Sequence, residues 1–232
     1  MSQAGTVAWL ALRELWVSFR LLVVLIAHVM AGAVVGLLPA FARDTVARLA
    51  LGLGVATLVT AAVAAWSLAD ERLAGRVGWL ITRSVSRGTY LAGWFVALAL
   101  VATLGVIAAG LLGWLAIGSA TLGGDRLAMP ATLVAVAATT AAAAALGLLC
   151  GSVLRPRAAV LVAVATCAAV WAAAWLASET SPLVPGGAHL LLARLVDADA
   201  VVTDALRAAG IGLALSSALL IAARAALDRS DL

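Results

Sequence analysis

Charge is scarce in this sequence, and lysine is absent from it altogether. Only 11% of the 232 residues are charged, whereas 65% are hydrophobic. The mean hydropathy of +1.15 lies far above that of water-soluble globular proteins. A soluble domain of this length could not bury so much apolar surface, so the composition predicts an integral membrane protein.

Long hydrophobic runs are abundant, and six of them meet the length that a bilayer demands. A hydrocarbon core about 30 Å thick is crossed by a helix of roughly 20 apolar residues. We expect helices because a lone strand exposed to lipid cannot satisfy its backbone polar groups. The prediction is an all-α membrane protein of six transmembrane helices, forming a single domain over residues 1–232. The predicted spans are Leu21–Leu38, Leu49–Ala69, Tyr90–Ile117, Ala131–Gly151, Ala158–Ala177 and Ala208–Ala226.

The arginines are unevenly divided between the two sides of these spans. Ten of the fifteen fall on the side that carries both termini. Because positively charged loops stay in the cytoplasm, we expect both termini there, in a multi-pass protein of the cytoplasmic (inner) membrane. The net charge of +4 then reflects membrane topology, and we expect no nucleic-acid partner, because no separate basic domain is present.

Acidic and basic residues are missing from the middle of every predicted span. Carriers driven by protons or ions usually keep such a group inside the membrane. His28 is the only titratable side chain midway along a span besides the thiols, and we interpret it as a packing residue. A transporter built this way would have to draw its energy from another subunit.

Catalytic and metal-binding patterns are also missing. Cys150 and Cys167 differ in expected depth by roughly 14 Å at about 1.5 Å per residue, which is too far for a disulfide. Neither has a CxxC partner or a neighbouring histidine, so we expect no metal site. We expect no catalytic or cofactor-binding residues, and hence no enzyme. Two alternatives stay open: an intramembrane enzyme acting on lipid or peptide through His28, Cys150 or Ser152, and a membrane anchor or assembly factor.

Two segments outside the spans have patterns of their own. Residues 1–20 place Trp9, Leu15 and Trp16 within an arc of roughly 120° on a helix, which predicts an amphipathic helix lying in the membrane interface against lipid. Residues 178–207 contain the breaker SPLVPGG and then AHLLLARLV, a piece too brief to span. We expect this segment to form an outer cap or a re-entrant excursion.

The loop at residues 70–89, DERLAGRVGWLITRSVSRGT, gathers four arginines. On a helix Arg72, Arg76 and Arg83 align, with Trp79 beside them. Such a helix would suit a membrane surface with anionic lipids. It would equally suit docking onto a cytoplasmic protein, because arginine and tryptophan are frequent interface anchors.

This loop resembles the first cytoplasmic loop of permease subunits of ATP-binding cassette (ABC) transporters, in the type-2 exporter family. That loop tends to read as an acid, a Gly-Thr step, a leucine-rich turn and a "stPvsR" step. Arg76 here replaces a common threonine, and Ser84 replaces the usual proline. The six spans and the basic turn before the fifth resemble the family's architecture. The matching positions are Glu71, Gly75, Leu80, Thr82, Val85, Ser86, Arg87, Tyr90 and Gly93.

The resemblance implies that two permease copies, this chain or a homologous one, pair with two cytoplasmic ATPase subunits. ATP and Mg²⁺ would bind on those subunits, because this chain lacks the phosphate loop GxxxxGK[ST]. ATP-driven closure would move the spans and export an amphipathic substrate such as a lipid, peptide or drug-like molecule. The residues implied in ATPase docking are Glu71, Arg72, Gly75, Arg76, Trp79, Leu80, Arg83, Arg87, Arg155 and Arg157.

Overall fold

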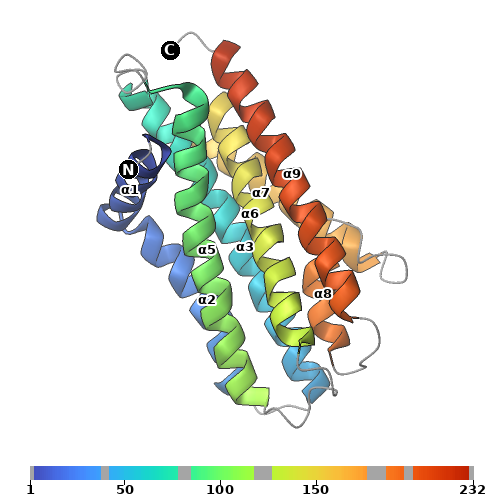
Figure 1. Cartoon of the computed structure of the whole chain (residues 1–232). Coiled ribbons are helices and arrows are strands. Elements are labelled where there is room, and N and C mark those ends of the chain that lie inside the picture. Colours follow the sequence, from blue (N-terminus) through green and yellow to red (C-terminus); the bar gives the residue numbers. More distant parts are fainter. Residues whose placement is uncertain are drawn as a thin grey trace.

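The structure is a computed structural model that describes residues 3–37, 42–77, 85–117, 127–176, 187–195 and 201–229. Within these ranges the chain is helical and contains no strand. The long helices run up and down in a bundle (Figure 1). The helices are α1 (Gln3–Val17), α2 (Arg20–Leu37), α3 (Ala42–Leu73), α5 (Arg87–Ile117), α6 (Ala128–Val153), α7 (Pro156–Leu176), α8 (Gly187–Arg194) and α9 (Val201–Arg229).

Five of the described helices are long and apolar enough to cross a membrane by themselves. These are α3, α5, α6, α7 and α9, and the count reaches six if α1 and α2, which meet at 77°, form one broken span. The predicted all-helical, multi-pass membrane class is therefore confirmed. The first predicted span corresponds to α2, which meets the criterion only together with α1.

Except for α2, the spanning helices are longer than the hydrophobic runs that predicted them. The last one begins at Val201 rather than at Ala208, so residues 201–207 of the predicted outer segment are the first two turns of α9. Asp204 and Arg207 form an ion pair of 3.7 Å in these turns. Hydropathy predicts only the part of a helix that is apolar enough for the hydrocarbon core. Backbone hydrogen bonding extends the helix further, into the polar residues that flank the apolar run.

Helix α6 forms the core of the bundle. Its apolar window is 67% buried, whereas that of α7 is only 17% buried. The cause is its small side chains, since runs of alanine and glycine let neighbouring backbones approach. A Cβ atom on Gly151 would lie 2.6 Å from the Ala65 carbonyl oxygen of α3, and one on Gly212 of α9 would lie 2.9 Å from the Ala138 carbonyl carbon.

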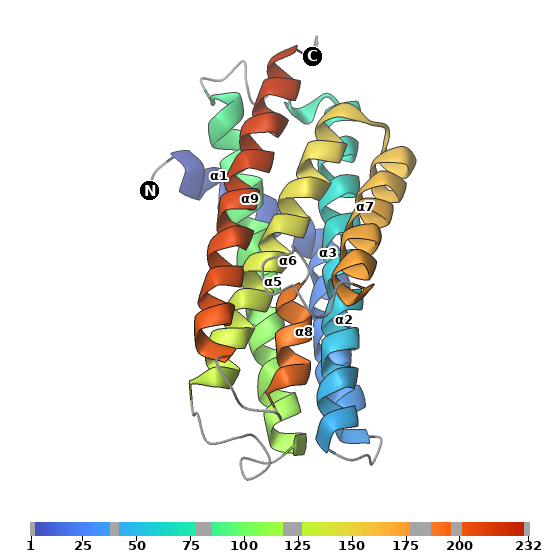
Figure 2. The ribbon, with the colours of Figure 1, turned by 90° about the vertical axis from the view of Figure 1, so that its right-hand side faces the viewer.

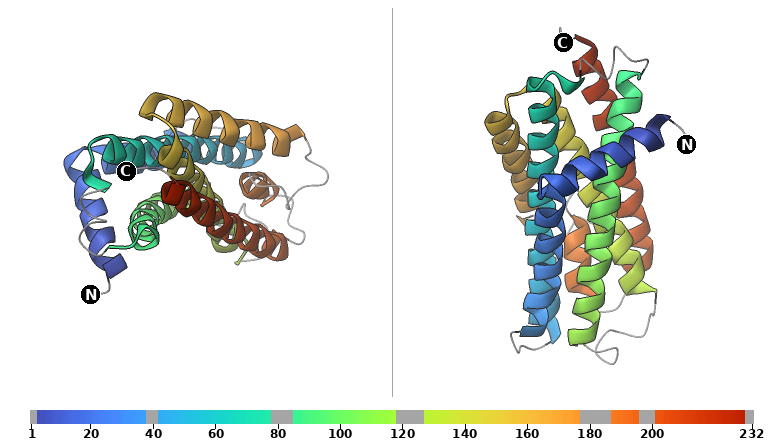
Figure 3. Two further views of the ribbon diagram at one scale, coloured as in Figure 1. Left: turned by 90° about the horizontal axis from the view of Figure 1, so that it is seen from above. Right: turned by 90° about the vertical axis from the view of Figure 1, so that its left-hand side faces the viewer.

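Helix α1 crosses the bundle instead of running along it (Figure 3, right). It buries Val7, Ala11 and Leu15, and a Cβ atom on Gly93 of α5 would meet Val7. Trp9 and Trp16 are 63% and 58% exposed, whereas Leu15 is only 1% exposed. The predicted apolar arc therefore has a buried edge and an exposed edge. Leu15 lies on the edge that packs on the protein, whereas Trp9 and Trp16 lie on the exposed edge.

Helix α8 packs against the side of the bundle, beside α3 and in the half away from the C-terminal end of α9 (Figure 2). Ala188, His189, Leu191 and Leu192 are all buried. Most of the other residues of the predicted cap at 178–207 lie outside the described part of the chain.

The packing of α9 on α6 can be tested with two glycines of one helix. Replacing Gly212 by alanine should lower thermal stability, because the new Cβ would press on the Ala138 backbone, which cannot rotate aside. Nothing lies within 4 Å of the corresponding position on Gly210. Gly210→Ala should therefore be neutral or stabilising, since alanine is favoured over glycine in a helix by up to about 1 kcal/mol. Thermal unfolding midpoints in detergent measure both, and equal midpoints for the two variants would contradict this packing.

Candidate functional site at the charged end of the bundle

The predicted docking residues gather at the end of the bundle where α3 and α9 end and α5 begins, which we call the charged end. Glu71 and Arg72 lie in the last turn of α3, and Gly75 and Arg76 follow it directly. Arg87 begins α5, while Arg155 and Arg157 flank the start of α7 and are exposed. Trp79, Leu80 and Arg83 lie outside the described residues.

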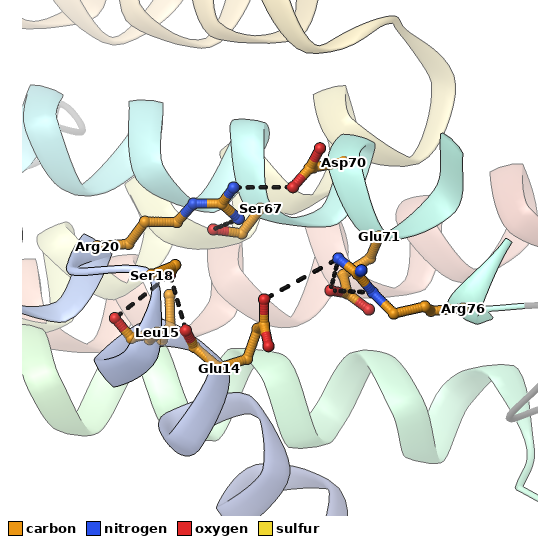
Figure 4. A network of polar contacts seen from close by, with 8 residues as sticks. All are labelled: Glu14, Leu15, Ser18, Arg20, Ser67, Asp70, Glu71 and Arg76. Atoms are coloured by element: carbon orange, nitrogen blue, oxygen red, sulfur yellow. Dashed lines mark hydrogen bonds and ion pairs between the residues drawn. The ribbon is translucent and has the colours of Figure 1, made fainter. Parts of the chain in front are cut away.

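Arg76 joins α1 to the end of α3. Its guanidinium donates a hydrogen bond of 2.9 Å from Nε to Glu71 Oε1, and a second nitrogen lies 2.7 Å from the same oxygen (Figure 4). It also lies 4.0 Å from a carboxylate oxygen of Glu14 on α1. The hydrogen bond with Glu71 raises the pKa of Arg76 above its ordinary value.

The turn after α3 explains how Arg76 reaches a residue on the helix it follows. Gly75 has a φ of 72°, in the left-handed region that glycine adopts without steric cost and that commonly ends helices. Its N–H donates to the Arg72 carbonyl at 3.1 Å. The chain therefore folds back at Gly75 and brings Arg76 onto Glu71.

A second ion pair fixes the bend between α1 and α2. Arg20, the first residue of α2, lies 2.8 Å from the Asp70 carboxylate and 3.4 Å from the Ser67 hydroxyl of α3 (Figure 4). At the same bend Ser18 donates a 2.7 Å hydrogen bond to the Glu14 carbonyl. The angle between the two helices is thus held from both sides of the bend.

Arg72 and Arg87 bind the ends of other helices. Arg72 donates a 2.8 Å hydrogen bond to the carbonyl of Leu154, which ends α6 directly before Arg155. Arg87 donates a 2.6 Å hydrogen bond to the carbonyl of Leu227 on α9, and its guanidinium lies 3.5 Å from Asp228. Cations at a helix C-terminus are favoured, because carbonyl groups there lack partners within the helix.

The helices at the charged end are therefore held together by hydrogen bonds and ion pairs within this chain. Three arginines of the loop, Arg72, Arg76 and Arg87, bind partners on other elements, and the structure brings the end of α3 against the turn between α6 and α7. The charge pattern left open whether this loop meets lipid or a soluble protein, and the resemblance implied that Arg72, Arg76 and Arg87 take part in ATPase docking. The charge pattern alone could not reveal that they hold helices of this chain together.

The residues of the enzyme alternative are not assembled into a catalytic group. The Nδ1 of His28 donates to the Val24 carbonyl at 2.8 Å, and the Ser152 hydroxyl donates to the Leu149 carbonyl at 2.7 Å. Cys150 lies in an apolar cluster with alanines of α3 and α7. Both hydrogen bonds lie within the helix of the donating side chain, and the buried Nε2 of His28 has no hydrogen-bond partner. Neither hydrogen bond brings a base or an orienting acid to a nucleophile.

A polar group at mid-depth was missed by sequence reasoning. The Thr57 hydroxyl of α3 lies 3.0 Å from the Thr140 hydroxyl of α6 and 3.2 Å from His189 Nε2 of α8. All three side chains are buried. The one available signal was the histidine in the short amphipathic segment, but the sequence left open whether this segment forms an outer cap or a re-entrant excursion.

Comparison with known proteins adds no relative: no family model matches this chain, and no curated protein matches it. At the charged end, hydrogen bonds and ion pairs connect the end of α3 and the following Arg76 with α1, with α2 and with the turn between α6 and α7.

Removing Arg76 from the Glu71–Arg76 ion pair should cost more stability than removing the charge of Glu71. The Glu71 side chain is 7% exposed and that of Arg76 is 50% exposed. Arg76→Ala leaves a buried carboxylate without its strongest partner and should lower the free energy of unfolding by about 1–3 kcal/mol. Glu71→Gln leaves an arginine that water can solvate, so its effect should be smaller. Denaturant unfolding measures both variants, with Arg157→Ala as the exposed control, and a larger loss in Glu71→Gln would contradict this assignment.

Proposed function

We propose that this chain is the membrane-spanning permease subunit of an ABC exporter, which moves an amphipathic substrate across the cytoplasmic membrane. The observation that carries the proposal is the hydrogen bond from Arg72 to the Leu154 carbonyl. It joins the loop that resembles an ATPase-docking segment to the α6–α7 turn and its exposed Arg155 and Arg157. Two segments far apart in sequence are thus held side by side, and in this proposal they form one surface on which the soluble partner docks.

The proposed orientation places the charged end in the cytoplasm, with both termini on that side. Helix α1, at 77° to α2, then lies along the membrane surface. Its exposed Trp9, Trp16 and the neighbouring Phe19 suit the headgroup region, where aromatic side chains are enriched. The charged residues of the bend, Arg20 and Asp70, fall at the same level.

In the proposed mechanism ATP and Mg²⁺ stay on the two ATPase subunits, and this chain receives only movement. Closure of the ATPase pair displaces the segment between Glu71 and Arg87. Arg76 and Arg20 transmit the displacement to α1 and α2, while Arg72 transmits it to the end of α6. Two permease copies moved in this way would alternate between inward-open and outward-open states.

The proposal is tested by gentle extraction of the chain from its native membranes, followed by identification of stoichiometric partners by mass spectrometry. We expect a soluble subunit with a phosphate-binding loop and vanadate-sensitive ATP hydrolysis. Repeated preparations that contain no ATPase would contradict the proposal.

Docking itself is tested by the double charge reversal Arg155→Glu and Arg157→Glu. Both side chains are exposed, so stability should be unchanged while co-purification of the ATPase falls several-fold. Arg207→Glu, a reversal of an exposed arginine at the other end of α9, is the matched control and should leave the ATPase bound. Equal recovery of the ATPase from both variants would place docking elsewhere.

A further inference from the structure

A groove opens on the side of the bundle between α7 and α9. Its floor is formed by α3 and α6, and its cavity volume is about 290 Å³. Helices α7 and α9 diverge on either side, and α8 lies between them (Figure 3, left). Pockets that bind small ligands in proteins start at about 300 Å³, so the space suits one slender molecule and not a bulky one.

The groove lies at the depth of the hydrocarbon core. Its floor includes Leu58 and Leu146, and its walls include Val170 and Leu219. These residues fall near the middle of helices that are long and apolar enough to cross a membrane. A groove at this depth faces lipid chains and not water, so its natural occupant is apolar.

One end of the groove is closed by polar side chains that already have partners. His189 of α8 lines it there and is bound to Thr57, which in turn contacts Thr140. Trp171 lies against Gly54 near this end, where a Cβ atom on the glycine would be 2.7 Å from the indole ring. His189 and Thr57 are bound to each other, whereas the buried indole N–H of Trp171 has no hydrogen-bond partner. Among the described residues that line the groove none is an acid or an arginine, so the closed end offers one neutral donor and no charge to a charged headgroup.

We propose that this groove binds one acyl chain of a lipid-like molecule, which enters sideways from the bilayer with the tip of its chain toward α8. The headgroup then lies on the side of Leu146 and Leu219, nearer the charged end. The identification of the bound molecule as the substrate rests on the proposed transport function. If the two are the same, the substrate class is narrowed to molecules with a flexible acyl chain. Binding by itself requires no ATPase.

The test uses vesicles containing a phosphatidylcholine with a diazirine in one acyl chain and the purified full chain. Photolabelling should be several-fold stronger at Thr166 and Cys167, which line the groove, than at Leu161, which is exposed elsewhere on α7. Unlabelled phosphatidylcholine is then added in place of another bulk lipid, with the mole fraction of the photoreactive lipid kept constant. It should reduce labelling in the groove more than labelling at Leu161, because the two phosphatidylcholines compete for a site, whereas bulk contact depends only on the mole fraction of the photoreactive lipid.

Two variants of α7 make the test specific. Thr166→Phe fills the groove and should remove most of the labelling at Cys167. Ala172→Phe adds the same side chain at an exposed position outside the groove lining and should leave the labelling unchanged. Equal labelling of the groove and Leu161, an unchanged Thr166→Phe variant, or cross-links from the groove to a second copy of the chain would each overturn the proposal. Labelling of the groove in a protein that never recovers an ATPase would refute the transport function and leave the acyl-chain site standing.

Discussion

The carboxylate of Glu71 has to be partnered, and much of the charged end is arranged around that requirement. A buried, ionised carboxylate is strongly unfavourable unless a cation and hydrogen bonds offset its lost hydration. Arg76 supplies both, and it reaches Glu71 only because Gly75 turns the chain back. The same arginine lies 4.0 Å from Glu14, so this group of charges also reaches α1, whose buried face packs on α5.

The other braces extend this junction to the remaining helices. Arg20 ties the start of α2 to α3, Arg72 ties α3 to the end of α6, and Arg87 ties α5 to α9. Away from this end the helices are joined by close packing of alanine and glycine, which fixes distances but forms few directional bonds. The described part of the bundle therefore has its most directional contacts at the charged end, and α7, the least buried span, leaves the groove open at its side.

The existence of the apolar helices could be predicted from the sequence, because hydropathy and helix length are local properties fixed by the bilayer. The partners of the arginines could not. Arg20 is 50 residues from Asp70, and Arg72 is 82 residues from Leu154, so these contacts depend on how the helices pack. His189 was missed for the same reason, since its contact with Thr57 spans 132 residues and requires a short helix to pack against the bundle. The arc of Trp9 and Leu15 showed that α1 has an apolar side, but only packing on α5 determined which edge is buried.

The most direct test of the junction is hydrogen–deuterium exchange on the full chain in two variants. If each arginine holds the element it contacts, Arg76→Leu should speed exchange of backbone amides in α1 and leave the α6–α7 turn unchanged. Arg72→Leu should do the reverse, loosening the turn around Leu154 while α1 stays protected. Unchanged exchange in both variants, or the same general loosening in each, would contradict the account of the charged end as a set of separate braces that pass movement to particular helices.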